Sequence, residues 1–301
     1  MHQRFTSFFP QLSADIQAAA LPIFNREQFN GILAPADIQA LKAQTGLDDD
    51  ALAIGLLPAA AAYSVAPISQ FHVGAIARGV SGNWYLGANV EFAGVPLGQS
   101  IHAEQCAIVH AWSCGETRLD TITVNYSPCG HCRQFMTELN SQRELKISLP
   151  GRDVLTLGDY LVDSFGPADL GIHTLLLDPQ DHGYSIQGNN HPLADAALEA
   201  ANRSHAPYSL SHSAVAILTD KGEVYAGAYA ENAAFNPSLP PLQAAVLMMY
   251  LKGSPDDRIL RAVVAEETAP QISQYASTLE TLRTLGCEDV QKLVITRRIN
   301  P

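Results

Sequence analysis

Three residues with metal-binding side chains stand out by type and spacing. Cys129 and Cys132 are three residues apart at a predicted helix start, so their sulfurs share one face, and His102 lies about two secondary elements upstream. A helix N-terminus favours thiolates through its free N–H groups and its dipole. Two thiolates and one imidazole provide three ligands for Zn²⁺ and leave a fourth position for water, which is typical of catalytic zinc sites.

A carboxylate follows the first of these ligands. Glu104 lies two residues after His102 and is a natural general base, which takes a proton from water and later returns it to a leaving group. Positions i and i+2 do not share a helix face, so the two side chains can meet over one site only at a helix tip. We therefore predict that His102 lies within a residue or two of a helix start.

A Cys-x-x-Cys pair alone also fits a redox pair or a structural zinc site. Glu104 favours the catalytic alternative, because a structural site needs no carboxylate beside its ligands. The odd number of cysteines, 5, argues for reduced thiols or metal ligands and against a disulfide framework. We expect Cys106 and Cys114 to pack in the protein, and His131 to lie on a helix surface without a metal role.

The bulk composition narrows the partners and the compartment. Only 18 Lys and Arg residues stand against 30 acidic ones, so a nucleic-acid polymer is a poor candidate partner. Residues 1–10 lack the long apolar core of a signal peptide. The apolar stretch 51–62 is interrupted by Pro58 and is too short to cross a bilayer. We expect a soluble cytoplasmic protein without membrane association.

The elements around these residues predict an α/β fold. Helical spacing covers residues 11 to about 48, and residues 151 to about 189 are rich in Gly, Pro and Asp. Between them strands and helices alternate, as in a sheet that carries helices on its faces. We expect Ser127 and Pro128 to open the last helix as N-cap and first residue. The expected strands are 71–78, 84–92, 121–126 and, in the Gly-rich part, 172–177.

The second half of the chain repeats the first. Residues 214–228 repeat the hairpin pattern of residues 73–88, and Glu231 aligns with Glu91. Where the first copy has its histidine ligand the second has Pro240, and Leu242 stands opposite Glu104. We therefore expect the second copy to be unable to bind zinc or to move protons.

The motifs His102-Ala-Glu104-Gln and Pro128-Cys-Gly-His-Cys132-Arg-Gln resemble those of the two-domain, homodimeric bacterial cytidine deaminases, over essentially the whole chain. The resemblance implies a duplicated three-layer α/β/α domain with a small N-terminal helical domain. The implied parts are a helical domain at 1–48, a catalytic domain at 49–150, a linker at 151–189 and a degenerate copy at 190–301.

The resemblance also implies roles for individual residues. One zinc ion per chain would be bound by His102, Cys129 and Cys132, and Glu104 would carry protons. The substrate would be contacted by Phe71 on the pyrimidine, Asn89 and Glu91 on the ribose hydroxyls, and the Ala103 N–H on the base carbonyl. Shorter members carry Asn where Phe92 stands here. Phe235 is a candidate for reaching the pocket of a partner subunit, and Phe165 is a second candidate.

The implied reaction is hydrolysis of cytidine and 2′-deoxycytidine to the uridines and ammonia, a step of pyrimidine salvage. One alternative is the same chemistry on a nucleotide, a tRNA base or another aminated heterocycle, although Glu91 would repel a nearby phosphate. A zinc-stabilised scaffold without activity is another. Phe71 and Phe235 also fit plain core positions, and Asn89 with Glu91 fits a simple turn at a strand end.

Overall fold

The computed structural model describes residues 2–188, 191–254 and 256–297. The chain forms two compact units, Met1–Glu91 with Ser100–Ser164, and Phe92–Gln99 with Phe165–Pro301. The expected boundary between residues 189 and 190 lies outside the described residues. Within the described part, every helix is too short or too polar to cross a bilayer.

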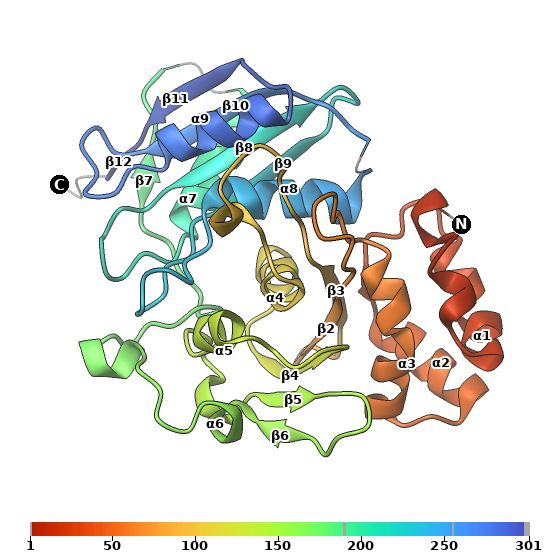
Figure 1. The fold of residues 1–301 in the computed structure, drawn as a ribbon. Helices are drawn as coiled ribbons and strands as arrows, with labels where there is room; N and C mark the ends of the chain where they lie inside the picture. The colour runs from red at the N-terminus through yellow and green to blue at the C-terminus, as the bar shows by residue number, and fades with distance from the viewer. Residues whose placement is uncertain (1, 189–190, 255, 298–301) are drawn as a thin grey trace. The chain divides into compact units, whose positions relative to one another are not determined.

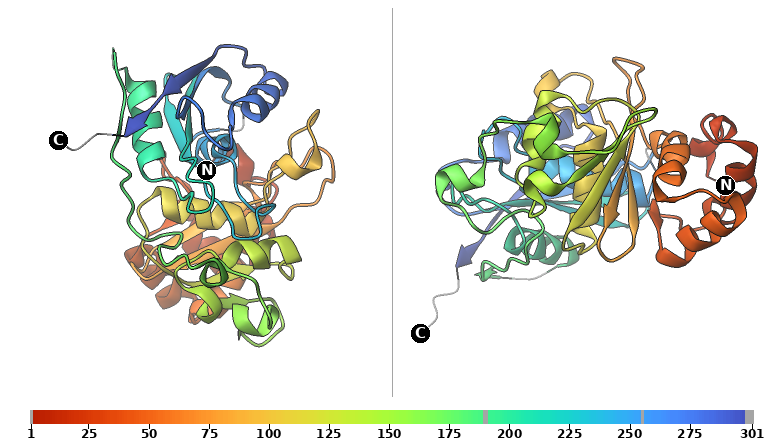
Figure 2. Two further views of the ribbon diagram at one scale, coloured as in Figure 1. Left: turned by 90° about the vertical axis from the view of Figure 1, so that its left-hand side faces the viewer. Right: turned by 90° about the horizontal axis from the view of Figure 1, so that it is seen from below.

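Near the start of the first unit, the helices α1 and α3 each begin at a residue whose side chain caps the helix. Ser13 accepts a hydrogen bond from the Ile16 N–H at the start of α1, and Asp48 accepts one from the Ala51 N–H at the start of α3. Figures 1 and 2 show these helices gathered beside the sheet. The helices predicted over 11–48 are confirmed as α1 and α2. The bounds are η1 Gln3–Phe5, η2 Phe9–Gln11, α1 Ala14–Phe24, α2 Pro35–Thr45 and α3 Asp49–Ala61.

The sheet of the first unit has the order β1-β3-β2-β4-β5-β6. Only the β4–β5 pair is parallel among these neighbours. The strands are β1 Ile32–Leu33, β2 Gly74–Gly79, β3 Trp84–Ala88, β4 Leu119–Val124, β5 Lys146–Ser148 and β6 Leu155–Thr156. Helix α3 packs on one face and α4 (Ala103–Ser113) on the other, which gives three layers (Figures 1 and 2).

Two glycines let the helices approach the sheet closely. A Cβ at Gly74 would lie 2.5 Å from the Leu57 carbonyl oxygen of α3, and one at Gly87 would lie 2.3 Å from the Ala107 nitrogen of α4. Residues Ala103–Trp112 of α4 are all buried, so this helix lies in the core although its N-terminus opens to the site. The remaining elements are η4 Gln142–Glu144, α5 Gly130–Met136 and α6 Leu157–Tyr160.

Two strand predictions were wrong in detail. Phe71 lies in a loop and β2 begins only at Gly74, because Gln70 has a φ of 55° and the Asn89 side chain bonds the backbone of Phe71 and Val73. Residues 172–177, all of them described, form no strand, and Leu177 has a φ of 81°. The Gly-rich region instead contains β6, α6, η5 Pro167–Leu170 and β7 Tyr184–Ser185.

The second unit repeats this architecture and confirms the duplicated fold. Its sheet has the order β11-β10-β8-β9, and Ala214 pairs with Ala228 as Gly74 pairs with Ala88. A Cβ at Gly227 would lie 2.2 Å from the Ala245 nitrogen of α8, which matches the close approach at Gly87. Its elements are η3 Leu97–Gln99, α7 Pro192–Asn202, β8 Ala214–Thr219, β9 Val224–Ala228, α8 Pro241–Lys252, β10 Ile259–Glu266, α9 Tyr275–Thr284, β11 Val290–Val294 and β12 Thr296–Arg297.

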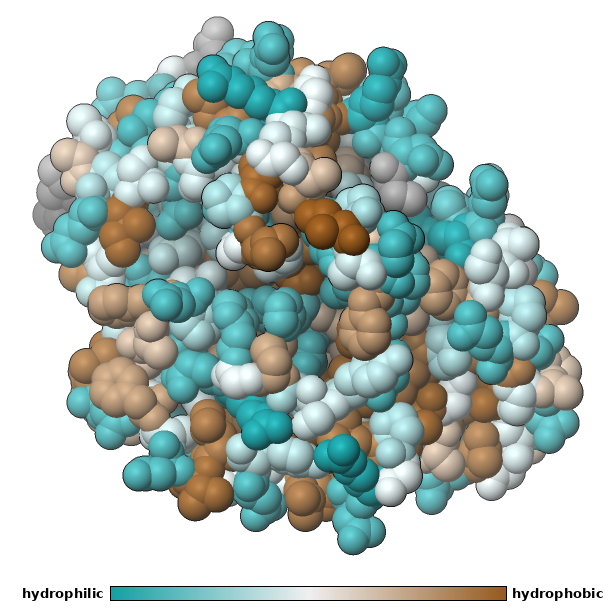
Figure 3. Space-filling model, viewed as in Figure 1, coloured by the Kyte–Doolittle hydropathy of each residue, from teal (hydrophilic) through white to brown (hydrophobic). Residues whose placement is uncertain are grey.

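On the face drawn in Figure 3, hydrophobic residues lie interspersed among hydrophilic ones. Such mixing is ordinary for protein surfaces, so a single exposed apolar side chain does not by itself indicate a binding site. The most exposed large hydrophobic side chains among the described residues are Val162 at 74%, Leu97 at 72% and Phe235 at 67%. Of these, only Phe235 was singled out from the sequence.

Candidate active site

A pocket of about 430 Å³ in the first unit gathers most of the predicted site residues. It lies where the chain leaves β3 and β4 and enters α4 and α5. Its walls include seven residues predicted from the sequence: Phe71, Asn89, Glu91, His102, Ala103, Glu104 and Cys129. Cys132 is buried directly beside Cys129.

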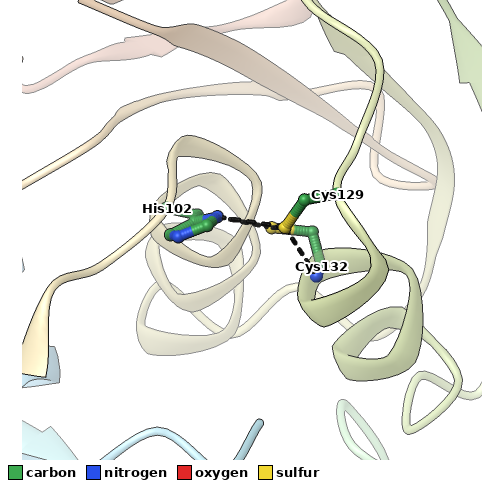
Figure 4. A group of neighbouring side chains, drawn as sticks. All are labelled: His102, Cys129 and Cys132. Atoms are coloured by element: carbon green, nitrogen blue, oxygen red, sulfur yellow. Dashed lines mark hydrogen bonds between the residues drawn. The ribbon is translucent and has the colours of Figure 1, made fainter. Parts of the chain in front are cut away.

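Three potential metal donors converge at this pocket (Figure 4). The Nδ1 atom of His102 lies 3.4 Å from the Cys129 sulfur and 3.1 Å from the Cys132 sulfur, and the sulfurs are 3.6 Å apart. Ligands of a tetrahedral zinc ion would be spaced about 3.8 Å from sulfur to sulfur and about 3.6 Å from sulfur to nitrogen. The donor types and spacing therefore fit one zinc ion. Among the described residues this is the one such group.

Helix starts position all three donors. His102 is the N-cap of α4, which confirms the prediction that it lies at a helix tip. The prediction that Ser127 is the N-cap of α5 was wrong. The N-cap is Cys129, whose sulfur accepts a hydrogen bond from the Cys132 N–H. Ser127 instead accepts a bond from Arg133, which also donates to the Pro128 carbonyl and so fixes the loop before the cap.

The donors shift one another's protonation. Hydrogen bonds from Cys132 and His102 lower the pKa of the Cys129 thiol to about 3, so this sulfur is a thiolate. The hydrogen bond to Cys129, together with burial, raises the pKa of Cys132, since two neighbouring thiolates repel each other. The bond to Cys129 raises the pKa of His102. A bound zinc ion would displace protons from these groups, because it binds thiolates and neutral imidazole.

Glu104 is 5% exposed and lies in the first turn of α4. Burial raises the pKa of its carboxyl, opposed by a hydrogen bond to its own N–H and by the nearby His102. A carboxyl with a raised pKa exchanges protons more readily near neutral pH than an exposed one. Its place at the wall of the same pocket as the donors is the arrangement that proton transfer requires.

Asn89 and Glu91 are both committed to hydrogen bonds within the first unit. The Asn89 carboxamide accepts from the Ser64 hydroxyl at 2.8 Å and from the Val73 N–H at 2.8 Å, and donates to the Phe71 carbonyl at 2.8 Å. Glu91 accepts from the Ser69 N–H at 3.0 Å. Its pKa is lowered by hydrogen bonds, chiefly from Ser69, although burial opposes them. Both side chains are therefore held rigidly at the pocket wall.

Aromatic rings form one side of the pocket. Phe71 is 49% exposed, and its ring lies 4.8 Å from that of Tyr126, which is 51% exposed. Tyr126 was not predicted from the sequence, although its position as the last residue of the strand expected over 121–126 was a signal. Phe92 is 3% exposed and lies in the second unit, as do Phe165 and Phe235. These three do not line the pocket.

The second copy has other residues at the matched positions. Pro240 is the N-cap of α8, where α4 has His102. Tyr229 stands where the first copy has Asn89, and it is buried, which raises the pKa of its hydroxyl.

Two protein-family models match most of the chain. Two family models, both described as the cytidine and deoxycytidylate deaminase zinc-binding region, match residues 48–147 and 157–279. Together with the donor group, they confirm that the chain has a zinc site. A crystal structure of cytidine deaminase from Mycobacterium tuberculosis is 34% identical, covers 40% of this chain and 99% of its own, and has a TM-score of 0.37.

Relatives of similar length match nearly the entire chain. A cytidine deaminase of Yersinia pestis (strain Pestoides F) is 57% identical over 293 residues, which is 97% of this chain and 99% of that protein. A cytidine deaminase of Yersinia pseudotuberculosis serotype O:1b (strain IP 31758) matches with the same values. On this identity and coverage, the chain belongs to the cytidine deaminase family.

Proposed function

We propose that the chain hydrolyses cytidine and 2′-deoxycytidine to uridine and 2′-deoxyuridine with release of ammonia, as in pyrimidine salvage. The observation that carries the proposal is the buried Glu104 carboxyl at the wall of a pocket that also holds the donor group. A purely structural zinc site has no use for a buried carboxyl that is not a ligand.

Glu104 performs the proton transfers in this proposal. His102, Cys129 and Cys132 would hold the zinc ion, which when bound would supply the Lewis acidity that makes water a nucleophile near neutral pH. Glu104 takes a proton from the attacking water and gives one to the pyrimidine ring nitrogen as the new carbon–oxygen bond forms at C4. Glu104 then takes the remaining proton from the new C4 hydroxyl and passes it to the amine, which leaves as ammonia as the carbon–nitrogen bond breaks and the C4 carbonyl forms.

The pocket wall suits a free nucleoside. Phe71 packs on the pyrimidine, and the Ala103 N–H, free at the first turn of α4, donates to the base carbonyl. Asn89 and Glu91 bind the ribose hydroxyls. Of the described residues that line the pocket, none is Lys or Arg, and Glu91 would repel a phosphate, which favours the nucleoside over the nucleotide.

We also propose that the chain acts as a cytoplasmic homodimer. The five cysteines are all free thiols, as is usual in a reducing compartment. Two copies of the fold per chain would let a dimer reproduce a four-domain assembly. Phe235, exposed on the second unit, is our candidate for completing the partner subunit's pocket, and Phe165 is the alternative.

The test is the fall in ultraviolet absorbance of cytidine with the purified protein beside the Glu104→Ala variant, with zinc quantified in both. We expect the parent alone to form uridine, while about one zinc per chain is present in each. Equal turnover by the variant, or loss of its zinc, would contradict the role of Glu104. A comparison with cytidine monophosphate tests the substrate class, since comparable rates would favour a nucleotide enzyme.

A further inference from the structure

One side chain, the hydroxyl of Ser69, joins the pocket residues Phe71 and Glu91. All three residues belong to the first unit and line its pocket. The Ser69 hydroxyl is hydrogen bonded to the Glu91 Oε1 atom, and its oxygen accepts at 3.0 Å from the Phe71 N–H. One hydroxyl therefore contacts both the residue proposed to pack on the base and the carboxylate proposed to bind the ribose.

The charge of Glu91 sets the direction of these two hydrogen bonds. Although burial opposes the change, hydrogen bonds lower the pKa of the Glu91 carboxyl, so it is ionised near neutral pH and can only accept. The single hydrogen of the Ser69 hydroxyl is therefore donated to Glu91, and an oxygen lone pair accepts from the Phe71 N–H. Because that hydrogen is already used, Ser69 has none left to donate to a substrate, and its effect on the pocket is indirect.

The backbone turn at Gln70 makes this link possible. Gln70 has a φ of 55°, in the left-handed region that residues with a side chain rarely adopt. The turn lets the Ser69 side chain reach the N–H group two residues further on. On the other side of Phe71, the Asn89 carboxamide donates to the Phe71 carbonyl at 2.8 Å. Side chains at the pocket wall therefore hold both backbone groups of Phe71.

We propose that Ser69 is a positioning residue for nucleoside binding, whose hydroxyl holds the Glu91 carboxylate and the Phe71 backbone in one arrangement. A ligand that contacts both residues binds more tightly when they are already held at the right separation. Because the hydroxyl contacts Glu91 and Phe71 but not Glu104, the effect falls on binding and not on proton transfer. This inference rests on the proposed function of the pocket, namely nucleoside binding.

The test is steady-state kinetics of the zinc-loaded full chain with Ser69→Ala and Ser69→Thr. Loss of the hydroxyl should raise KM for cytidine by about 2- to 10-fold, with kcat changed by less than about twofold. The Kd for uridine, measured by calorimetry, should rise in parallel. Ser69→Thr keeps the hydroxyl at an exposed position and should stay near the parental KM.

A double variant shows whether Ser69 acts through Glu91. In a Glu91→Ala background, Ser69→Ala should raise KM by a smaller factor than in the parent, because the carboxylate that the hydroxyl holds is already gone. Equal factors in the two backgrounds would overturn the proposed link. A parental KM and Kd in Ser69→Ala would overturn it too, while cytidine turnover by the parent would still uphold the proposed function.

The matched control is Ser81→Ala, in the turn between β2 and β3 of the same unit. The Ser81 hydroxyl is also hydrogen bonded to a carboxylate, that of Glu116, and its oxygen accepts from the Asn83 N–H two residues further on. Ser81 is not among the residues that line the pocket, so this variant should keep the parental KM. An equal rise of KM in Ser81→Ala and Ser69→Ala would overturn the positioning role.

Amide hydrogen exchange decides the positioning role without turnover. If the parent does not convert cytidine, the proposed function fails, but the link between Ser69 and Glu91 can still be measured. The Ile68 N–H donates at 2.8 Å to the Glu91 Oε2 atom and so reports on the place of the carboxylate. Faster exchange at Ile68 in Ser69→Ala than in the parent would support the positioning role, and unchanged exchange would overturn it.

Discussion

Glu91 and Glu231 occupy matched positions in the two copies, and their carboxylates accept the same three hydrogen bonds. Each accepts from two successive backbone N–H groups and from one serine hydroxyl. The donors are Ile68 and Ser69 for the first, and Tyr208 and Ser209 for the second. The network recurs in the copy where Pro240 stands in place of the histidine ligand, so it serves the fold, and Glu91 has a structural role beside its proposed one.

Replacing these glutamates should separate the two roles. Glu231→Ala leaves three donors without their acceptor at a 3% exposed site and should lower the free energy of unfolding by about 1–3 kcal/mol. Glu91→Ala should cost less stability, since its site is more exposed, but should raise KM for cytidine. Urea unfolding and kinetics of the zinc-loaded variants measure both effects. The control is Glu223→Ala at an exposed turn. Equal urea midpoints for Glu231→Ala and Glu223→Ala would refute the structural role of the Glu231 network.

Removing one sulfur should abolish zinc binding. Cys132→Ser replaces a thiolate with a hydroxyl, a much poorer zinc ligand, so the zinc content after gel filtration should fall from about one per chain to near zero. The thermal midpoint should fall too, because zinc stabilises the state that binds it. Cys114→Ser, outside the donor group, should keep its zinc. Full zinc in Cys132→Ser would mean that the donor group is not the zinc site.

The backbone of Phe235 suggests a test of its side chain. Its φ of 64° is in the left-handed region, which costs a non-glycine residue about 1 kcal/mol or more, and its ring is 67% exposed. Phe235→Gly should keep the thermal midpoint, since glycine adopts this φ freely, but should lower kcat/KM if the ring completes a partner's pocket. Leu210→Gly relieves a similar φ of 55° at a residue with 58% exposure and serves as the control. The same kcat/KM in both variants and the parent would remove Phe235 from the site.

The buried His212 of the second unit, which lies against the half-buried His182, predicts a pH dependence of stability. The rings of His182 and His212 are 3.5 Å apart, and burial, with the nearby His182, lowers the pKa of His212 to about 3. An unfolded histidine titrates near pH 6.5, so between these values the unfolded chain binds the extra proton. The stabilisation is fully present above about pH 6.5 and falls by about 1.4 kcal/mol per pH unit below it.

Amide exchange in β8 measures this dependence in the second unit, after correction for the intrinsic exchange rate. His212→Asn, which has no titrating ring, should flatten the loss of protection between about pH 5 and about pH 6.5 relative to the parent. The control His173→Gln removes an exposed histidine instead. Parallel curves for the parent and His212→Asn would show that His212 does not take up the proton.

The sequence predicted the parts of the site that depend on short-range spacing. The three-residue separation of Cys129 and Cys132, and the place of His102 two residues before Glu104, restrict these side chains to helix tips. The repeat of the hairpin pattern predicted the duplicated fold, because alternation along a strand records which face is buried. The roles of Phe71, Asn89, Glu91 and Ala103 stay predictions, although the structure brings these residues to one pocket.

Tertiary packing decided the rest. Only the packing of α4 and α5 at one end of the sheet brings the His102 imidazole within 3.4 Å of both sulfurs and places Tyr126 beside Phe71. Cys129 can act as the N-cap because Arg133 holds the loop before it. Phe71 lies in a loop because its carbonyl accepts a hydrogen bond from the Asn89 side chain and not from a neighbouring strand. These contacts join residues far apart in the chain, whose meeting depends on how whole elements pack and not on local spacing. The sequence by itself therefore determined which chemistry is available, and the tertiary structure decided which side chains surround it.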